Sequence, residues 1–136
     1  MIRDLMSSEQ NLPQVLLVED DHGVRRSLQL LLRGRGLEVR AYASGAALIA
    51  DPRALSAACL VADYRMPEVD GFAVLRGLRD LGWTGQALLI TAFHSTELVA
   101  RAHQAGFSHV MEKPLVERAL VEAVERMTRD PLNPAP

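Results

Sequence analysis

The chain is 136 residues long; 49% of its residues are hydrophobic and 24% are charged, and its formal net charge is −2. This size and composition predict one soluble globular domain. A net charge so close to zero gives no electrostatic footprint for nucleic acid or anionic lipid, so we expect the domain to contact neither nucleic acid nor a membrane directly. No apolar run approaches the roughly 18 residues that a membrane-spanning helix needs.

The two ends of the chain differ in composition from its middle. Residues 1–13 are polar and non-periodic, lack the apolar run of a signal peptide, and are predicted to form a flexible lead. Residues 130–136 are rich in proline and are predicted to form a tail or linker, which leaves a domain at 14–129. The single cysteine, Cys59, cannot form an internal disulfide, which fits a reducing compartment and a cytoplasmic location.

Five short apolar segments have the character of β-strands. Three are apolar throughout, which is typical of strands covered on both faces, and they lie at 15–18, 58–62 and 87–90. Two are mixed in polarity, which favours the edges of a sheet, and they lie at 37–42 and 107–111.

Segments with helical periodicity separate these strands, at about 24–33, 44–50, 70–81, 96–105 and 116–128. The last is the clearest, because its apolar residues recur at helical spacing: Val116, Leu120, Ala123, Val124 and Met127. Strict alternation of strand and helix predicts parallel βαβ units with right-handed crossovers. The predicted fold class is therefore α/β, a single doubly wound (βα)5 parallel sheet with the flavodoxin-like strand order 2-1-3-4-5.

Polar side chains follow the predicted strands at the points where the strands end. In a parallel sheet all these carboxyl ends lie along one rim, where ligands bind. We therefore expect carboxylates, one hydroxyl and one ammonium group to converge there: Glu19-Asp20-Asp21, Asp63, Thr91 and Lys113. The chain has 14 arginines and only this one lysine, and a compact ammonium differs from a planar guanidinium in size and hydration.

This set of groups suits phosphoryl transfer. Oxygen ligands without nitrogen or sulfur favour a hard cation such as Mg²⁺, which accepts phosphate as a further ligand. A carboxylate such as Asp63 is a competent nucleophile towards phosphorus and forms an aspartyl phosphate. Charge neutralisation and positioning can come from the metal, from Lys113 and from the Thr91 hydroxyl.

Some of the charged residues also fit structural roles. Asp70 is interpreted as a helix cap, and for Asp21 capping and a part in the site both stay open. Arg25 and Arg26 are interpreted as a solvated helix face. The four histidines show no metal-ligand spacing.

Four short motifs stand at the strand ends. They are Leu17-Val18-Glu19-Asp20-Asp21, Asp63-x-x-Met66-Pro67-x-x-Asp70-Gly71, Ile90-Thr91-Ala92 and Lys113-Pro114. In this order and spacing they closely resemble the receiver domain of two-component response regulators, over about residues 14–128. The resemblance implies that Asp63 accepts a phosphoryl group from the phosphohistidine of a sensor histidine kinase or phosphotransfer protein.

The resemblance also implies roles for the other rim residues. Mg²⁺ is expected to bind Glu19, Asp20, Asp63 and the backbone carbonyl of Arg65. Thr91 is expected to bind a phosphoryl oxygen and Lys113 to pair with the phosphoryl group, next to a cis Lys113-Pro114 bond. The domain is expected to catalyse only its own phosphorylation and dephosphorylation, so it is not a conventional enzyme.

The chain departs from the family pattern at two positions that bear on signalling. Val110 stands where the family usually has an aromatic residue that swings inward on activation, and Arg65 stands where side chains govern the approach of water. We expect phosphorylation to change the face built from the helix at 96–105, the strand at 107–111 and the last helix. That face is expected to bind an output partner or a second copy of the chain.

Two other functions remain as alternatives. An aspartyl-phosphate phosphatase of the haloacid dehalogenase type also uses an aspartate at a strand end, but it needs a second aspartate where this chain has Arg65. A flavodoxin-like cofactor binder needs a phosphate-cradling loop after the first strand, where Glu19-Asp20-Asp21 would repel phosphate.

Overall fold

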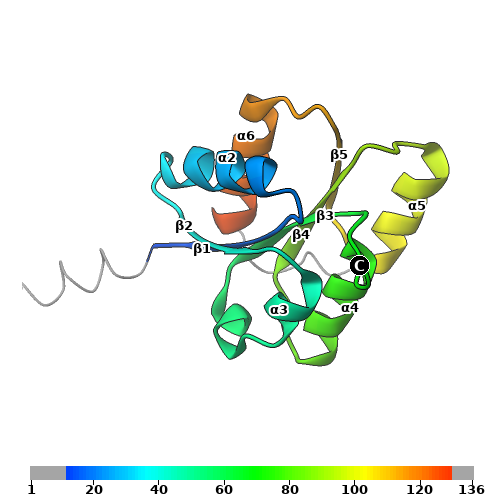
Figure 1. Cartoon of the computed structure of the whole chain (residues 1–136), viewed down its shortest axis with the longest axis horizontal. Coiled ribbons are helices and arrows are strands. Elements are labelled where there is room, and N and C mark those ends of the chain that lie inside the picture. Colours follow the sequence, from blue (N-terminus) through cyan, green and yellow to red (C-terminus); the bar gives the residue numbers. More distant parts are fainter. Residues whose placement is uncertain (1–11, 130–136) are drawn as a thin grey trace, which may run out of the picture.

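The computed structural model describes residues 12–129 (Figure 1). The predicted tail at 130–136 lies outside the described residues, as does the predicted lead at 1–13 apart from its last two residues. No helix in the described range is long and apolar enough to cross a membrane.

Five parallel strands form one sheet in the order β2-β1-β3-β4-β5, which confirms the predicted topology. The strands are β1 (Gln14–Val18), β2 (Glu38–Tyr42), β3 (Cys59–Asp63), β4 (Gln86–Thr91) and β5 (His109–Glu112). The two strands of mixed polarity, β2 and β5, occupy the edges, as predicted. The three apolar strands lie between them, because only there do both faces of a strand lose contact with water.

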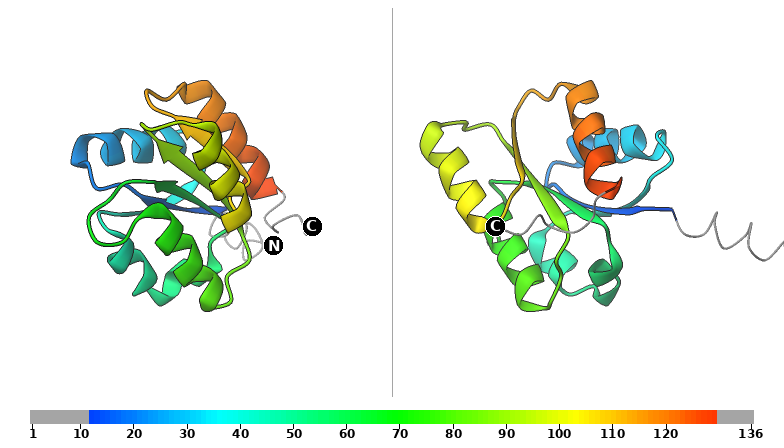
Figure 2. Two further views of the ribbon diagram at one scale, coloured as in Figure 1. Left: turned by 90° about the vertical axis from the view of Figure 1, so that its right-hand side faces the viewer. Right: turned by 180° about the vertical axis from the view of Figure 1, so that it is seen from behind.

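Helices cover both faces of the sheet. They are α2 (His22–Arg33), α3 (Gly45–Ile49), α4 (Gly71–Asp80), α5 (Thr96–Ala105) and α6 (Glu117–Arg129), with a 3-10 helix, η1, at Pro52–Ser56. Figures 1 and 2 show α2 and α6 on one side of the sheet and α3, α4 and α5 on the other. This is the doubly wound arrangement that alternating strands and helices predict.

The core is divided into two layers by the alternation of side chains along the strands. On one side Leu16, Leu60 and Leu89 pack with residues of α3, α4 and α5. On the other side Leu17 and Val61 pack with α2 and α6. Because both layers are apolar and tightly closed, the sheet is a rigid platform for the groups at its rim.

One local prediction needs correction, and one short element was not predicted. Val116 was expected on the buried side of the last helix, but it is 67% exposed and precedes α6, which begins at Glu117. The short helix predicted at 44–50 does end before Asp51-Pro52, since α3 ends at Ile49, but η1 was not predicted; it begins at Pro52, with Asp51 as its N-cap. The Asp51 carboxylate accepts a hydrogen bond from the backbone N–H of Arg53, which favours a new helical turn there.

Candidate phosphoacceptor and metal site

The predicted rim residues meet at the carboxyl ends of the strands. Asp63 is the last residue of β3 and Thr91 is the last residue of β4. Glu19 is the residue directly after β1. Lys113 follows β5, and its backbone N–H donates a hydrogen bond to the carbonyl of Thr91, at 2.8 Å. Strand register therefore brings together side chains that are up to 94 positions apart in the sequence.

Three carboxylates form the centre of the site. Glu19, Asp20 and Asp63 each present one carboxylate oxygen, and these atoms lie within 4.8 Å of one another. Glu19 is 1% and Asp63 7% exposed, whereas Asp20 is exposed to solvent. Close carboxylates repel one another, and burial removes the water that would screen them. An all-oxygen cluster of this kind fits a hard divalent cation, as the sequence predicted.

Lys113 supplies the positive charge that the described residues bring into this cluster. Its Nζ lies 3.0 Å from Glu19 Oε1 and 3.4 Å from Asp63 Oδ1. Burial opposes the charged form of Lys113, but the hydrogen bond to Glu19 and the charges of Glu19 and Asp63 outweigh it, so the pKa of Lys113 is raised. The ammonium group therefore stays charged and links the two buried acids.

One ammonium does not fully compensate the buried acids. Burial raises the pKa of Glu19 to about 7, although hydrogen bonds from the backbone N–H of Asp21 and from Lys113 work in the opposite direction. A further cation nearby would stabilise the charged form of this carboxyl group and lower its pKa. The cluster thus has both the ligands and the charge deficit of a metal site.

The two aspartates with a possible capping role are both caps. Asp21 accepts from the Val24 backbone N–H at 2.9 Å, at the start of α2. Asp70 accepts from the Ala73 backbone N–H at 2.9 Å, at the start of α4. Neither belongs to the group of carboxylates that could share a metal.

A small pocket opens beside Asp63. Its volume is about 170 Å³, several times the roughly 30 Å³ share of a water molecule, so a tetrahedral oxyanion has room there. It is lined by Asp63, Arg65, Thr91, Ala92, Phe93 and Lys113. The Thr91 hydroxyl oxygen accepts a hydrogen bond from the Phe93 backbone N–H at 2.8 Å, which leaves the hydroxyl proton to donate to another group.

Sequence reasoning missed the arrangement at the mouth of this pocket. The Arg65 guanidinium carbon lies 4.2 Å from the centroid of the Phe93 ring, at cation–π distance. Phe93 is 53% exposed, so the ring is held outside the core and within reach of Arg65. The signal available in the sequence was an aromatic residue two positions after Thr91 and an arginine two positions after Asp63, but only the fold shows that they touch.

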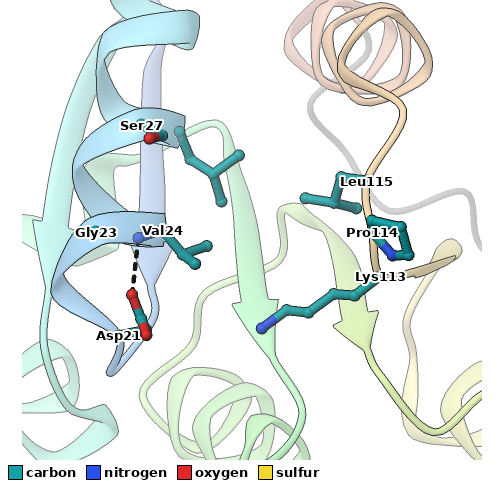
Figure 3. Close-up of a pocket in the computed structure, with 8 residues that line it drawn as sticks. Asp21, Gly23, Val24, Ser27, Lys113, Pro114 and Leu115 are labelled. Atoms are coloured by element: carbon teal, nitrogen blue, oxygen red, sulfur yellow. Dashed lines mark hydrogen bonds between the residues drawn. The ribbon is translucent and has the colours of Figure 1, made fainter.

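A larger groove lies on the other side of Lys113. Its volume is about 560 Å³, and it lies between the start of α2 and the segment after β5. Figure 3 shows the Lys113 side chain extending away from that segment towards the sheet, with Pro114 and Leu115 above it in this view. The Lys113-Pro114 peptide bond is cis, as predicted. Lys113 therefore lines both the groove and the charged pocket.

The chain belongs to the response regulator receiver domain family, whose family model matches residues 15–125. It is a receiver domain of two-component response regulators. Members of this family are phosphorylated by histidine kinases.

Individual relatives agree with this assignment. The chain is 33% identical over 112 residues to the transcriptional regulatory protein FixJ of Rhizobium meliloti, covering 82% of this chain and 55% of that protein. It is 33% identical over 110 residues to the response regulator protein TmoT of Ectopseudomonas mendocina, covering 81% of this chain and 50% of that protein. The chain thus spans about half the length of these curated relatives.

Solved structures give the same fold. The crystal structure of FixJ-N superposes with a TM-score of 0.77 at 32% identity, covering 86% of this chain and 94% of that one. The chemotaxis protein CheY4 of Vibrio cholerae gives a TM-score of 0.77 at 22% identity, covering 85% and 98%, and at that identity it supports the fold alone. The family assignment favours the receiver over both the phosphatase and the cofactor-binding alternatives.

Proposed function

We propose that this domain is a cytoplasmic phosphoacceptor switch in which Asp63 is the phosphorylated residue. The donor is the phosphohistidine of a sensor histidine kinase or phosphotransfer protein. The observation that carries this proposal is the convergence of Glu19, Asp20, Asp63 and Lys113 beside a pocket of oxyanion size. Family membership supports it independently.

The proposed reaction moves one phosphoryl group from nitrogen to oxygen. An Asp63 carboxylate oxygen attacks phosphorus, the bond from phosphorus to the donor imidazole breaks, and its electron pair stays on the imidazole nitrogen. Lys113 keeps its charge beside Asp63 and balances the oxyanion, and the Thr91 hydroxyl donates a hydrogen bond to a phosphoryl oxygen. Attack by water later releases inorganic phosphate and restores the Asp63 carboxylate, so no separate substrate is turned over.

We further propose that the metal is Mg²⁺. Glu19, Asp20, Asp63 and the backbone carbonyl of Arg65 would hold it, which fits the all-oxygen donor set and the charge deficit at Glu19. When bound, Mg²⁺ supplies charge neutralisation for the phosphoryl oxygens.

The output of the switch is proposed to be the face formed by α5, β5 and α6. Thr91 ends the strand that leads to α5, and Lys113 lies in the connection between β5 and α6, so groups that contact the phosphoryl adjoin this face. The face would bind an output partner or form a homodimer. The net charge of −2 supports the proposal that this domain itself does not contact nucleic acid.

The test is the intact mass of the protein after incubation with Mg²⁺ and a small phosphodonor such as acetyl phosphate. We expect the wild type to gain one phosphoryl group, to gain none when EDTA replaces Mg²⁺, and Asp63→Asn to gain none. Asp70→Asn is the matched control, because Asp70 caps α4 and lies outside the carboxylate cluster. Equal gain of mass by Asp63→Asn and the wild type would overturn the proposal.

A further inference from the structure

The sequence suggested that Arg25 lies on a solvated helix face. In the structure its side chain instead turns back onto the loop at residues 19–21, which carries three acidic residues. Its Nη1 donates to the backbone carbonyl of Glu19 at 2.9 Å and lies 3.4 Å from the carbonyl of Asp20. Its Nη2 lies 3.1 Å from His22 Nδ1. One guanidinium thus contacts two residues of the connection between β1 and α2 and the first residue of α2.

Glu19 and Asp20, the two acids of this loop that belong to the carboxylate cluster, are held in different ways. The carboxylate of Glu19 is held directly, by Lys113 on one oxygen and by the Asp21 backbone N–H on the other. The exposed side chain of Asp20 takes part in none of the hydrogen bonds found in residues 12–129, so its direction depends on the backbone that carries it. That backbone is fixed on the sheet side, where the Glu19 N–H donates to the carbonyl of Tyr42 at 3.1 Å, and on the helix side by Arg25.

We propose that Arg25 is a positioning residue for the metal site, which holds the backbone of Glu19 and Asp20 so that the Asp20 carboxylate faces Asp63. This inference rests on the proposed function, since it assigns a role in the Mg²⁺ site. The planar guanidinium contacts the two carbonyls through Nη1 and His22 through Nη2 in a fixed geometry, which the single nitrogen of a lysine ammonium cannot reproduce. Groups behind metal ligands commonly determine how well the ligands are aimed.

Charge and positioning make opposite predictions for this residue, which makes the inference testable. Arg25 is a cation close to a cation site, so by charge alone its removal tightens Mg²⁺ binding. By positioning, its removal frees the Asp20 backbone and weakens Mg²⁺ binding. Arg26 is the matched control: it is the next residue, it is exposed, and it carries the same charge.

The experiment is calorimetric titration of Mg²⁺ into the metal-free wild type, Arg25→Gln, Arg25→Lys and Arg26→Gln. We expect Arg25→Gln to weaken binding about 10-fold, Arg25→Lys to fall between it and the wild type, and Arg26→Gln to bind as tightly as the wild type or more tightly. Hydrogen exchange in EDTA supplies a second measurement, and we expect faster exchange over residues 19–22 in Arg25→Gln only. Should Arg25→Gln fail to fold, Arg25→Lys carries the comparison, because it keeps the charge and loses the fork.

The outcomes separate this inference from the proposed function. Binding by Arg25→Gln and Arg25→Lys that is as tight as wild-type binding overturns the role of Arg25 alone. Weakening of equal size in Arg25→Gln and Arg26→Gln also overturns it, because such an effect does not depend on the contacts that Arg25 makes with the loop. A wild type that binds no Mg²⁺ overturns the proposed function, and this inference with it.

Discussion

At the scale of single residues, the site is a problem of charge balance. Glu19 and Asp63 are buried, and among the described residues Lys113 is the cation that touches both. An arginine at this position would bring a larger, planar group into the 170 Å³ pocket. The use of the chain's one lysine here therefore has a physical reason, which the sequence alone could only suggest.

This balance predicts how the stability of the metal-free protein depends on pH. The folded-state pKa of Glu19, about 7, is above the ordinary value of 4.5. A raised pKa means that the contribution to stability is complete below pH 4.5 and is lost as the pH rises through about 7. We expect the Glu19 contribution to the free energy of unfolding to fall by up to roughly 3 kcal/mol across that range.

Urea unfolding in EDTA at pH 5 and pH 7.5 measures this effect, with the fluorescence of the buried Trp83 as the signal. Glu19→Gln is the control, because it removes the titrating group and should flatten the difference between the two pH values. A wild type whose stability changes between these pH values just as that of Glu19→Gln does would contradict the charge account.

At the scale of elements, the acidic residues have two roles. Some belong to the carboxylate cluster at the ends of the strands, and others cap the helices that follow. Asp20 points its carboxylate to the cluster, and its neighbour Asp21 caps α2. Gly71 opens α4 next to Asp63, and a Cβ there would lie 2.8 Å from the Asp63 backbone oxygen. A bare backbone at this position thus allows helix and strand end to approach each other closely.

The division of tasks predicts opposite effects for two adjacent substitutions. Asp21→Ala removes the cap of α2, so we expect the free energy of unfolding to fall by about 1 kcal/mol and Mg²⁺ affinity to stay close to that of the wild type. Asp20→Ala removes one of three mutually repelling carboxylates, so we expect unchanged or higher stability in EDTA and weaker Mg²⁺ binding. Urea unfolding in EDTA and Mg²⁺ titration measure both quantities, and loss of Mg²⁺ binding in Asp21→Ala alone would reverse the assignment.

The central strands and the placement of the site residues at one rim of the sheet could be predicted from the sequence. The apolar runs at 15–18, 58–62 and 87–90 identified the central strands, because only buried strands can be apolar throughout. The motifs at the strand ends then located Asp63, Thr91 and Lys113 on one rim, because parallel topology leaves no other place for them.

What could not be predicted depends on side-chain direction and on capping. Arg25 and Arg26 are equivalent in the sequence, and only the turn of α2 decides which one reaches the Glu19 carbonyl. The stacking of Arg65 on Phe93 joins two loops that have no common pattern. Val116 continues the apolar period of α6 but lies just before the helix begins, where periodicity no longer determines burial.

At the scale of the whole molecule, the sheet connects one charged rim to two layers of helices. The layer of α3, α4 and α5 and the layer of α2 and α6 are separated by the strands (Figure 2). Val110, which stands where an aromatic residue is usual in the family, is partly buried against the first layer. We therefore expect a change at Lys113 to reach the proposed output face through backbone and aliphatic packing at β5, and a change at Thr91 to reach it also through the loop that leads to α5.

This arrangement predicts where phosphorylation acts. On addition of Mg²⁺ and beryllofluoride, a phosphoryl analogue, we expect amide chemical shifts to change along α5, β5 and the start of α6 as well as at the rim. The amides of α3 serve as an internal control, because the main contacts of α3 are with α4, η1, β1 and β2, outside the proposed output face. Shifts confined to the residues around Asp63 would argue against the proposed face.

The central claim, that Asp63 is the residue that becomes phosphorylated, can be tested by chemical mapping. After reaction with Mg²⁺ and acetyl phosphate, borohydride reduces an aspartyl phosphate to homoserine, and trypsin releases the peptide 54–65, in which Asp63 is the only acidic residue. We predict homoserine at position 63 in the wild type and unmodified aspartate when Mg²⁺ is replaced by EDTA. Reduction at another carboxyl group, with Asp63 intact, would contradict the account.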